Sequence, residues 1–121
     1  MFNDFDVIFR YTREQAINDG VLVDVTETAK EAGFSVPVAV TRTVWDEYIK
    51  PSEEERESGQ DEDGRLWDTL FMLFVEIRRA SEKPELKYKV LYSGEEVELK
   101  AVISPGDYGE PVVTIMLPHE D

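Results

Sequence analysis

The clearest pattern along the chain is a helical one in its second half. Between Arg65 and Ser81, apolar residues recur at intervals of three and four, as they do on one face of an α-helix. These residues are Leu66, Leu70, Leu73, Phe74 and Ile77. Arg78 and Arg79 follow, where cations complement the negative end of a helix dipole. The pattern predicts one main amphipathic helix over about 65–81.

The apolar face of this predicted helix is unusually broad, because Trp67, Phe71, Met72 and Val75 are apolar as well. A helix with so broad a face is either covered on two sides or presents a surface to a partner. One interpretation is therefore a homodimer that forms through the 66–77 face of the helix.

After Pro84 the period changes to two, which is typical of strands with one buried face. Apolar residues alternate with Lys and Glu in two segments, and Ser93 with Gly94 forms the turn between them. A second turn over 105–109 precedes a last apolar segment. The three segments are 86–92, 97–103 and 112–117. They predict a three-stranded antiparallel meander, with the main helix on its apolar face.

The N-terminal half contains signals for two short helices, over 13–19 and 27–32. Thr12 and Gln15 have the spacing of a capping box, and Thr26 is a candidate cap for the second helix. Each helix is followed by a glycine that can take a left-handed conformation and end it. These glycines are Gly20 and Gly33.

A strand and a third helix are predicted next. The segment 35–40 is apolar but contains Pro37, which cannot donate a hydrogen bond to a ladder, so we expect an edge strand or a lead-in to the helix. Thr41 or Thr43 caps that helix, which ends before Pro51. The prediction is an α+β fold in one domain, 1–121, with N-terminal short helices, one or two short strands, and the main helix on a C-terminal three-stranded antiparallel meander.

The composition agrees with one globular domain and restricts its partners. Hydrophobic residues make up 41% of the 121 residues, enough for a core. The chain carries 27 Asp and Glu against 13 Lys and Arg, a formal net charge of -14 at pH 7. Such a chain repels nucleic-acid phosphates and anionic lipids, so we expect no direct nucleic-acid binding and no membrane binding.

The expected location is the cytoplasm. The longest apolar run, 70–75, is far shorter than the roughly 20 residues of a spanning helix. Residues 1–10 lack the basic and apolar regions of a signal peptide. The absence of Cys fits a reducing compartment and leaves no thiol nucleophile or zinc-thiolate site.

The most acidic segment, about 52–64, is expected to be a flexible, solvated loop. Asp61, Glu62, Asp63 and Gly64 resemble the middle of a calcium loop. With Gly64 at the sixth position, however, the first and twelfth positions are not acidic, so the alignment fails. We predict no metal site there, and the acidic residues supply negative charge to the start of the main helix.

No motif in the chain points to an enzyme or a cofactor. The carboxylates lie in polar runs, whereas catalytic pairs need environments that separate two pKa values. His119, the one His, is three residues from the C-terminus and we interpret it as a tail residue. The alternative that stays open is a small carboxylate- or metal-dependent hydrolase.

The leading hypothesis is a non-enzymatic protein that contacts a basic protein surface. Carboxylates would steer the encounter and Trp67 would anchor it, although a Trp at helical spacing is more often a core residue. The predicted contact residues are Glu53, Glu54, Glu55, Glu57, Asp61, Glu62, Asp63 and Trp67. A DNA mimic is a variant of this idea, because 14 charges match the phosphates of about 7 base pairs.

Four stretches of the chain resemble a known family. They are 11–25 (YTREQAINDGVLVDV), 37–48 (PVAVTRTVWDEY), 60–68 (QDEDGRLWD) and 109–118 (GEPVVTIMLP). They are similar to a family of small acidic proteins of unknown function, a domain of unknown function from bacteria and their phages and plasmids. The resemblance implies no activity and no catalytic residues. By analogy, it implies an accessory protein of a mobile element, with an anti-defence or regulatory role.

Overall fold

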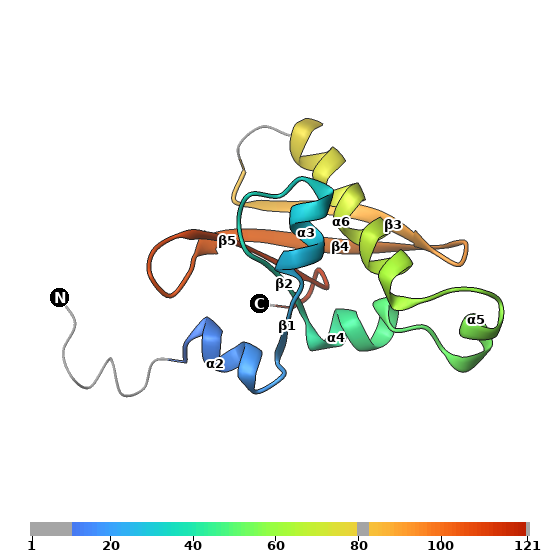
Figure 1. The fold of residues 1–121 in the computed structure, drawn as a ribbon. Coiled ribbons are helices and arrows are strands. Elements are labelled where there is room, and N and C mark those ends of the chain that lie inside the picture. Colours follow the sequence, from blue (N-terminus) through green and yellow to red (C-terminus); the bar gives the residue numbers. More distant parts are fainter. Residues whose placement is uncertain (1–10, 80–82, 121) are drawn as a thin grey trace.

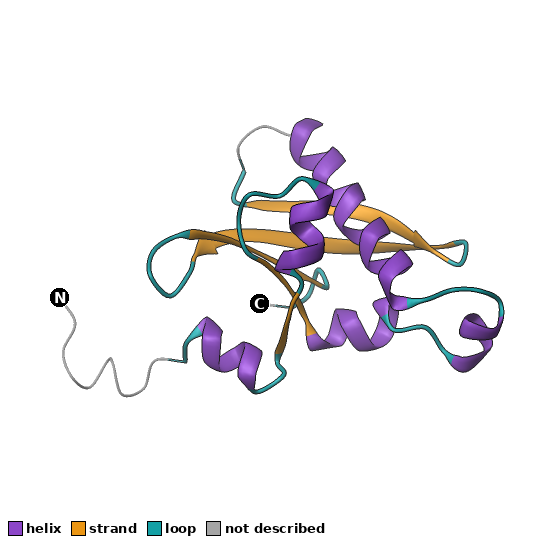
Figure 2. Cartoon of the chain, in the orientation of Figure 1, coloured by secondary structure: helices purple, strands orange, loops and turns teal. Residues whose placement is uncertain are grey.

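The structure, a computed structural model, describes residues 11–79 and 83–120. It has two layers, a mixed β-sheet and a layer of helices. Helices α3 (Thr26–Ala32) and α6 (Glu62–Arg79) lie across one face of the sheet (Figure 1). The shorter helices lie beside the sheet rather than across it (Figure 2). The predicted α+β class is confirmed.

The sheet has five strands among the described residues, in the order β1-β2-β5-β4-β3. Strand β2 pairs with β5 in parallel, and the other neighbours are antiparallel. Strands β1 and β3 are therefore the two edges. The bounds are β1 (Leu22–Asp24), β2 (Val38–Thr41), β3 (Glu85–Tyr92), β4 (Glu95–Pro105) and β5 (Pro111–Met116).

The predicted C-terminal meander is present but is only part of the sheet. Strands β3, β4 and β5 pair antiparallel in sequence order, as the alternating pattern indicates. The meander does not form a sheet by itself, because β5 also pairs with β2, with Val38 opposite Val113. This pairing joins segments far apart in the sequence, and no local pattern specifies such a contact.

The expectation that 35–40 forms an edge strand or a lead-in is wrong. Strand β2 lies inside the sheet between β1 and β5, and all four of its residues are buried. Pro37 is compatible with this position because it precedes the strand and only its carbonyl is used. That carbonyl accepts the N–H of Val113 at 2.9 Å.

The first two helices follow the predicted caps closely. Thr12 and Gln15 make both hydrogen bonds of the capping box of α2 (Arg13–Asn18). In α3, Thr26 is the first helical residue rather than the cap, and the Asp24 carboxylate accepts its N–H at 3.1 Å. Both glycines that end these helices have positive φ angles, as predicted: Gly20 and Gly33.

The segment between β2 and α6 contains more helix than predicted. Of the two candidate caps, Thr41 accepts the N–H of Val44 at 3.2 Å. The helix it caps continues as a π-helical turn and ends before Pro51, as predicted. The segment 52–64, expected as a loop, contains a short helix with its own capping box. These elements are α4 (Arg42–Val44), η1 (Trp45–Ile49) and α5 (Glu53–Glu57).

Helix α6 corresponds to the predicted main helix but begins three residues earlier, at Glu62. Its predicted end at Ser81 lies outside the described residues. One side of α6 is buried on the sheet, and the side chains on that side are Arg65, Leu66, Thr69, Leu70 and Leu73. The core residues of the sheet beneath include Tyr88, Val90, Leu99, Val113 and Ile115. Within the described parts of the chain, no helix combines the length and apolar character needed to cross a membrane.

Gly33 is predicted to be essential for packing α3 against α6. Its φ is +112°, and a Cβ there would lie 2.9 Å from Cε1 of Phe74. We expect Gly33→Ala to lower the free energy of unfolding by about 1–3 kcal/mol, measured by urea denaturation. Gly59→Ala is the matched control, because Gly59 has φ +97° and no atom within 4 Å of such a Cβ. Equal losses in the two variants would contradict a role for the Phe74 contact.

Candidate functional site

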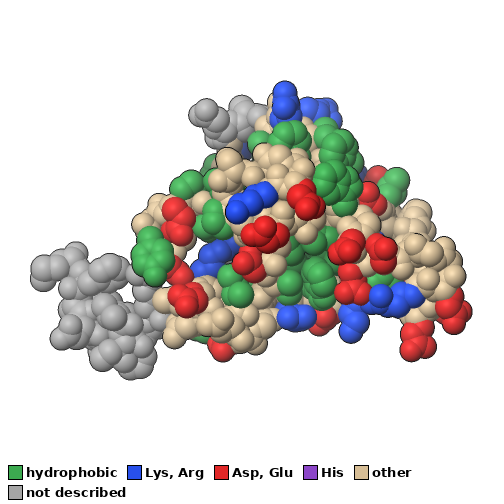
Figure 3. Space-filling view, viewed as in Figure 1, with side chains coloured by type: hydrophobic (Ala, Val, Ile, Leu, Met, Phe, Trp, Pro, Cys, Tyr) green, Lys and Arg blue, Asp and Glu red, His purple; other side chains and the backbone are tan. Residues whose placement is uncertain are grey.

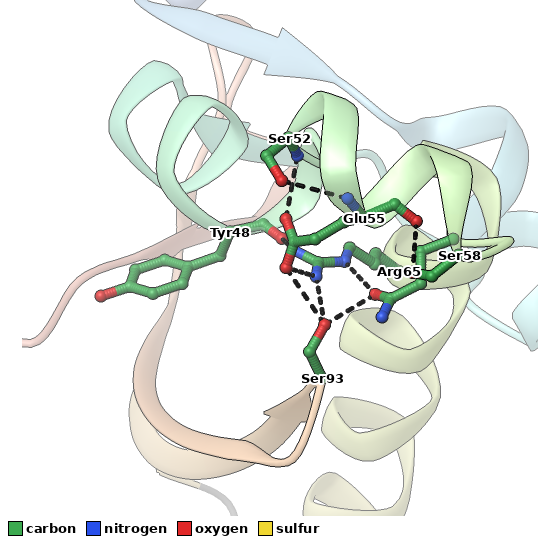
Figure 4. A network of polar contacts seen from close by, with 7 residues as sticks. Tyr48, Ser52, Glu55, Ser58, Arg65 and Ser93 are labelled. Atoms are coloured by element: carbon green, nitrogen blue, oxygen red, sulfur yellow. Dashed lines mark hydrogen bonds and ion pairs between the residues drawn. The ribbon is translucent and has the colours of Figure 1, made fainter.

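A buried arginine connects the acidic segment to the sheet. The Arg65 side chain, on the first turns of α6, is 7% exposed. Its guanidinium donates to the Tyr48 carbonyl at 2.7 Å and to Glu55 Oε2 at 2.6 Å. It also donates to Gln60 Oε1 at 2.9 Å and to Ser93 Oγ at 2.7 Å. Figure 4 shows these groups converging from η1, α5, α6 and the β3–β4 turn.

Two local features of the structure position the Arg65 guanidinium. The β3–β4 turn has positive φ angles at Ser93 (54°) and Gly94 (83°), which brings the Ser93 hydroxyl to the guanidinium. The guanidinium also lies 5.7 Å from the ring centre of Tyr92, whose ring stacks on that of Tyr48. We call Arg65 and its four hydrogen-bond partners the Arg65 network.

Glu55 is held in its ionised form within this network. Its carboxylate accepts the backbone N–H of Ser52 at 2.9 Å, which closes the capping box of α5. This bond, followed by the bond from Arg65, lowers the pKa of Glu55 from 4.5 to about 2. A lowered pKa is the opposite of what a general acid needs at neutral pH.

A second set of polar contacts fixes α6 on β3 below the Arg65 network. Thr69 is fully buried, and its hydroxyl lies 2.5 Å from the hydroxyl of Tyr92. The Tyr88 hydroxyl donates to the Thr69 carbonyl at 3.1 Å. Burial raises the pKa of Tyr92 to about 12 and that of Tyr88 well above 10. Both phenols therefore stay protonated, and they set the rotation of α6 about its axis.

This rotation leaves large apolar side chains in solvent. Trp67 is 40% exposed, Phe71 47% and Met72 40% on the outer side of α6. Independently of this rotation, Leu91 is 62% exposed on the face of β3 away from α6. Trp67 is therefore not a core residue, unlike most Trp residues at helical spacing. Figure 3 shows hydrophobic side chains gathered over α6 with acidic side chains beside them.

Two hollows adjoin along this side of the molecule and share Asp68. We call the first the α6–β3 groove; it has a volume of about 360 Å³ and lies between the outer side of α6 and β3. Its lining residues are Asp68, Phe71, Met72, Lys89, Val90, Leu91 and Glu96. The second, the Trp67 hollow, has a volume of about 490 Å³ and is lined by Trp67, Asp68, Asp61 and Ser93 among others. Together they form a surface on which Trp67, Phe71 and Met72 lie beside carboxylates.

The structure brings only part of the predicted contact set together. Asp61 and Trp67 line the same hollow. Asp63 lines a different one, beside Leu66. Three other members are exposed on α5 and line neither the groove nor the Trp67 hollow. They are Glu53, Glu54 and Glu57.

Three predicted contact residues have structural roles in addition to their charge. Glu55 belongs to the Arg65 network. Glu62 pairs with Arg56. The Asp61 carboxylate accepts the N–H of Gly64 at 2.7 Å, in the first turn of α6. Their carboxylates thus hold the acidic segment in place.

Sequence reasoning missed part of the surface. Phe71 and Met72 appear in the sequence only as extra members of a broad helix face, and no motif in the sequence draws attention to Leu91 or Glu96. One signal could have found Leu91. The other exposed positions of β3 are charged, so an apolar Leu at an exposed position of this strand is unusual.

The arrangement of acidic and histidine side chains can be compared with the geometry of a metal site. Within 11–79 and 83–120, no group of three or more His, Asp or Glu side chains is arranged to hold a metal ion. His119 is exposed in the turn that follows β5.

The chain matches a family model over residues 1–121, and the description of that family is "Family of unknown function (DUF6573)". No curated protein and no solved structure matches the chain. The comparisons therefore supply membership of a family but no activity.

The Arg65 network predicts a specific pH dependence. Because the pKa of Glu55 is lowered from 4.5 to about 2, its contribution to the free energy of unfolding is complete above about pH 4.5 and is lost as the pH falls toward 2. We expect Glu55→Gln, which can still cap α5, to remove this part of the acid destabilisation, measured by urea denaturation from pH 6 to 2. Glu54→Gln on the same helix is the control. An identical pH profile for both variants would contradict the assignment.

Proposed function

The chain belongs to the family DUF6573 along its whole length, and we propose that it is a non-enzymatic protein-binding domain. Its ligand is a segment of another protein that carries apolar side chains and at least one Lys or Arg. The α6–β3 groove and the Trp67 hollow receive this segment. The observation that carries the proposal is the exposure of Trp67, Phe71, Met72 and Leu91 on one continuous surface.

The apolar part of this surface fits the composition of protein-binding sites. Aromatic residues and Met are enriched in interfaces, and a few such anchors usually supply most of the binding free energy. Trp67 and Phe71 are one helical turn apart on α6, and Leu91 lines the groove at the edge of β3. The scaffold under them is held by the Arg65 network and by Thr69. Binding therefore requires only a small loss of conformational entropy in the protein.

The charged part of the surface sets the type of partner. Asp61 and Asp68 border the Trp67 hollow, and Asp68 and Glu96 border the groove, where Glu96 pairs with Lys89 at 3.4 Å. With a net charge of -14, the whole protein attracts a cationic segment and repels nucleic acid and anionic lipid. A second copy carries the same charge, so we favour a different, basic partner over a homodimer through α6.

The distribution of charge also favours this reading over a DNA mimic. A mimic needs a continuous array of carboxylates on one face. On the face shown in Figure 3, acidic side chains alternate with basic and hydrophobic ones. The acidic residues near α6 border an apolar surface instead, which fits a protein ligand better.

The proposal predicts selective binding of a basic peptide. The probe is a ten-residue peptide, called the lysine peptide, in which Thr occupies every second position and either Val or Lys occupies the positions between. A control, called the glutamate peptide, has Glu in place of each Lys. We expect the lysine peptide to bind at least ten times more tightly at low salt, measured by amide NMR titration, with shifts concentrated in α6 and β3. Equal binding of both peptides, or none, would rule out the proposed ligand class.

Two substitutions test the location of the site. We expect Phe71→Ser to weaken binding of the lysine peptide about ten-fold, because it removes an aromatic anchor. Tyr108→Ser is the matched control, since Tyr108 is 88% exposed but lies between β4 and β5, away from the groove. Thermal melting of both variants verifies that the fold is retained. An equal effect of the two substitutions would place the site elsewhere.

A further inference from the structure

Strand β3 leaves one side of its backbone open. It is an edge of the five-stranded sheet, and among residues 11–79 and 83–120 its eight residues pair on one side only, with β4. The other edge, β1, has three residues. A long edge strand is a template for a further strand unless something covers it.

The ladder shows which backbone groups point outward. Ile103 donates its N–H to the Pro84 carbonyl at 2.7 Å, so this is a hydrogen-bonded pair, and such pairs alternate along an antiparallel ladder. The two-residue turn at Ser93 and Gly94 independently places a hydrogen-bonded pair at Tyr92 and Glu95. The two ends of β3 therefore agree on which residues form hydrogen-bonded pairs with β4. The residues whose N–H and C=O groups point away from β4 are Glu85, Lys87, Lys89 and Leu91.

The α6–β3 groove runs along this open edge. Its lining includes three consecutive residues of β3, Lys89, Val90 and Leu91. Successive side chains of a strand point to opposite faces, so a hollow in contact with all three lies at the edge of the strand and not over one face. The helix α6 forms the opposite wall through Phe71 and Met72. Apolar side chains of α6 thus lie beside the backbone N–H and C=O groups of β3 that point away from β4.

We propose that the partner segment binds in extended form, as a sixth strand added to β3, with its alternate side chains against α6. This inference rests on the proposed function and specifies its mode. Main-chain hydrogen bonds to β3 provide affinity in such complexes, and pockets for alternate side chains provide specificity.

The two faces of the added strand meet different chemistry. Side chains directed toward α6 meet Phe71 and Met72, with Asp68 at one end, so apolar residues and one Lys or Arg fit there. Side chains on the other face lie beside Lys87, Lys89 and Leu91, which are exposed on the side of the sheet away from α6. Like charges opposite each other are unfavourable in a sheet, so that face requires neutral or acidic residues. The ligand is therefore an amphipathic strand, not simply a basic peptide.

Backbone methylation of the lysine peptide tests this mode. One version carries N-methyl groups at its Thr positions and another at its Val and Lys positions, and amide NMR titration measures both. We expect one version to bind at least ten times more weakly than the parent and the other to stay within three-fold, because every second N–H of an added strand faces β3. Loss at the Thr positions indicates antiparallel addition, and loss at the Val and Lys positions indicates parallel addition.

Other outcomes are equally informative. If both versions bind like the parent, side chains dock without a new strand, and the inference is wrong. If both lose binding, the ligand binds in a helical or irregular form, and the inference is wrong as well. If the unmodified lysine peptide does not bind, the proposed function fails and this inference falls with it.

A pair of protein variants supplies a second test. Lys89→Pro removes an outward N–H of β3 at an edge position, where Pro is tolerated. We expect it to weaken binding of the lysine peptide at least ten-fold, while circular dichroism verifies the fold. Lys89→Ala also loses the ion pair with Glu96, whose atoms lie 3.4 Å apart, but keeps the N–H. It should bind within three-fold of wild type, and equal loss in the two variants would contradict strand addition.

Discussion

The burial of one cation, Arg65, is the constraint on which the rest of the structure depends. A buried guanidinium is costly unless nearly all of its donors are used. Here they are used by groups from η1, α5, Gln60 before α6 and the β3–β4 turn. Removing one of these partners leaves part of a buried charge without a hydrogen bond, which is destabilising. A domain of this size has only roughly 6–18 kcal/mol of stability, so these four parts of the chain are strongly coupled.

This coupling gives an acidic segment a defined position. Without Arg65, the carboxylates between α5 and α6 would repel one another and remain solvated. With it, Glu55 is ionised and paired, and Asp61 is placed at the start of α6 beside Trp67. The same contacts fix the β3–β4 turn against α6. The groove that we propose as a binding site therefore has two walls that are joined at one end by the Arg65 network.

The polar contacts of Thr69 explain why the outer side of α6 can be apolar. A broad apolar helix face can rotate on a sheet, because many rotations bury a similar area. The hydroxyl groups of Thr69 and Tyr92 and the carbonyl that Tyr88 contacts are satisfied in one rotation only. That rotation buries Leu66, Leu70 and Leu73 and leaves Trp67, Phe71 and Met72 in solvent. The exposed surface follows from satisfying buried polar groups.

The sequence by itself determined the elements whose signals are local. Thr12 with Gln15, Gly33, the three-and-four spacing of Leu66 to Ile77 and the alternation around Ser93 and Gly94 act within one turn or one strand, so they are readable in order along the chain. Only the tertiary structure decided that β2 lies beside β5, that Arg65 is buried while Trp67 is exposed, and that Leu91 and Phe71 share a groove. These facts depend on contacts between segments that are distant in the sequence. Such contacts are selected by the free energy of the whole fold, so neither segment alone contains a hydrophobic pattern that predicts them.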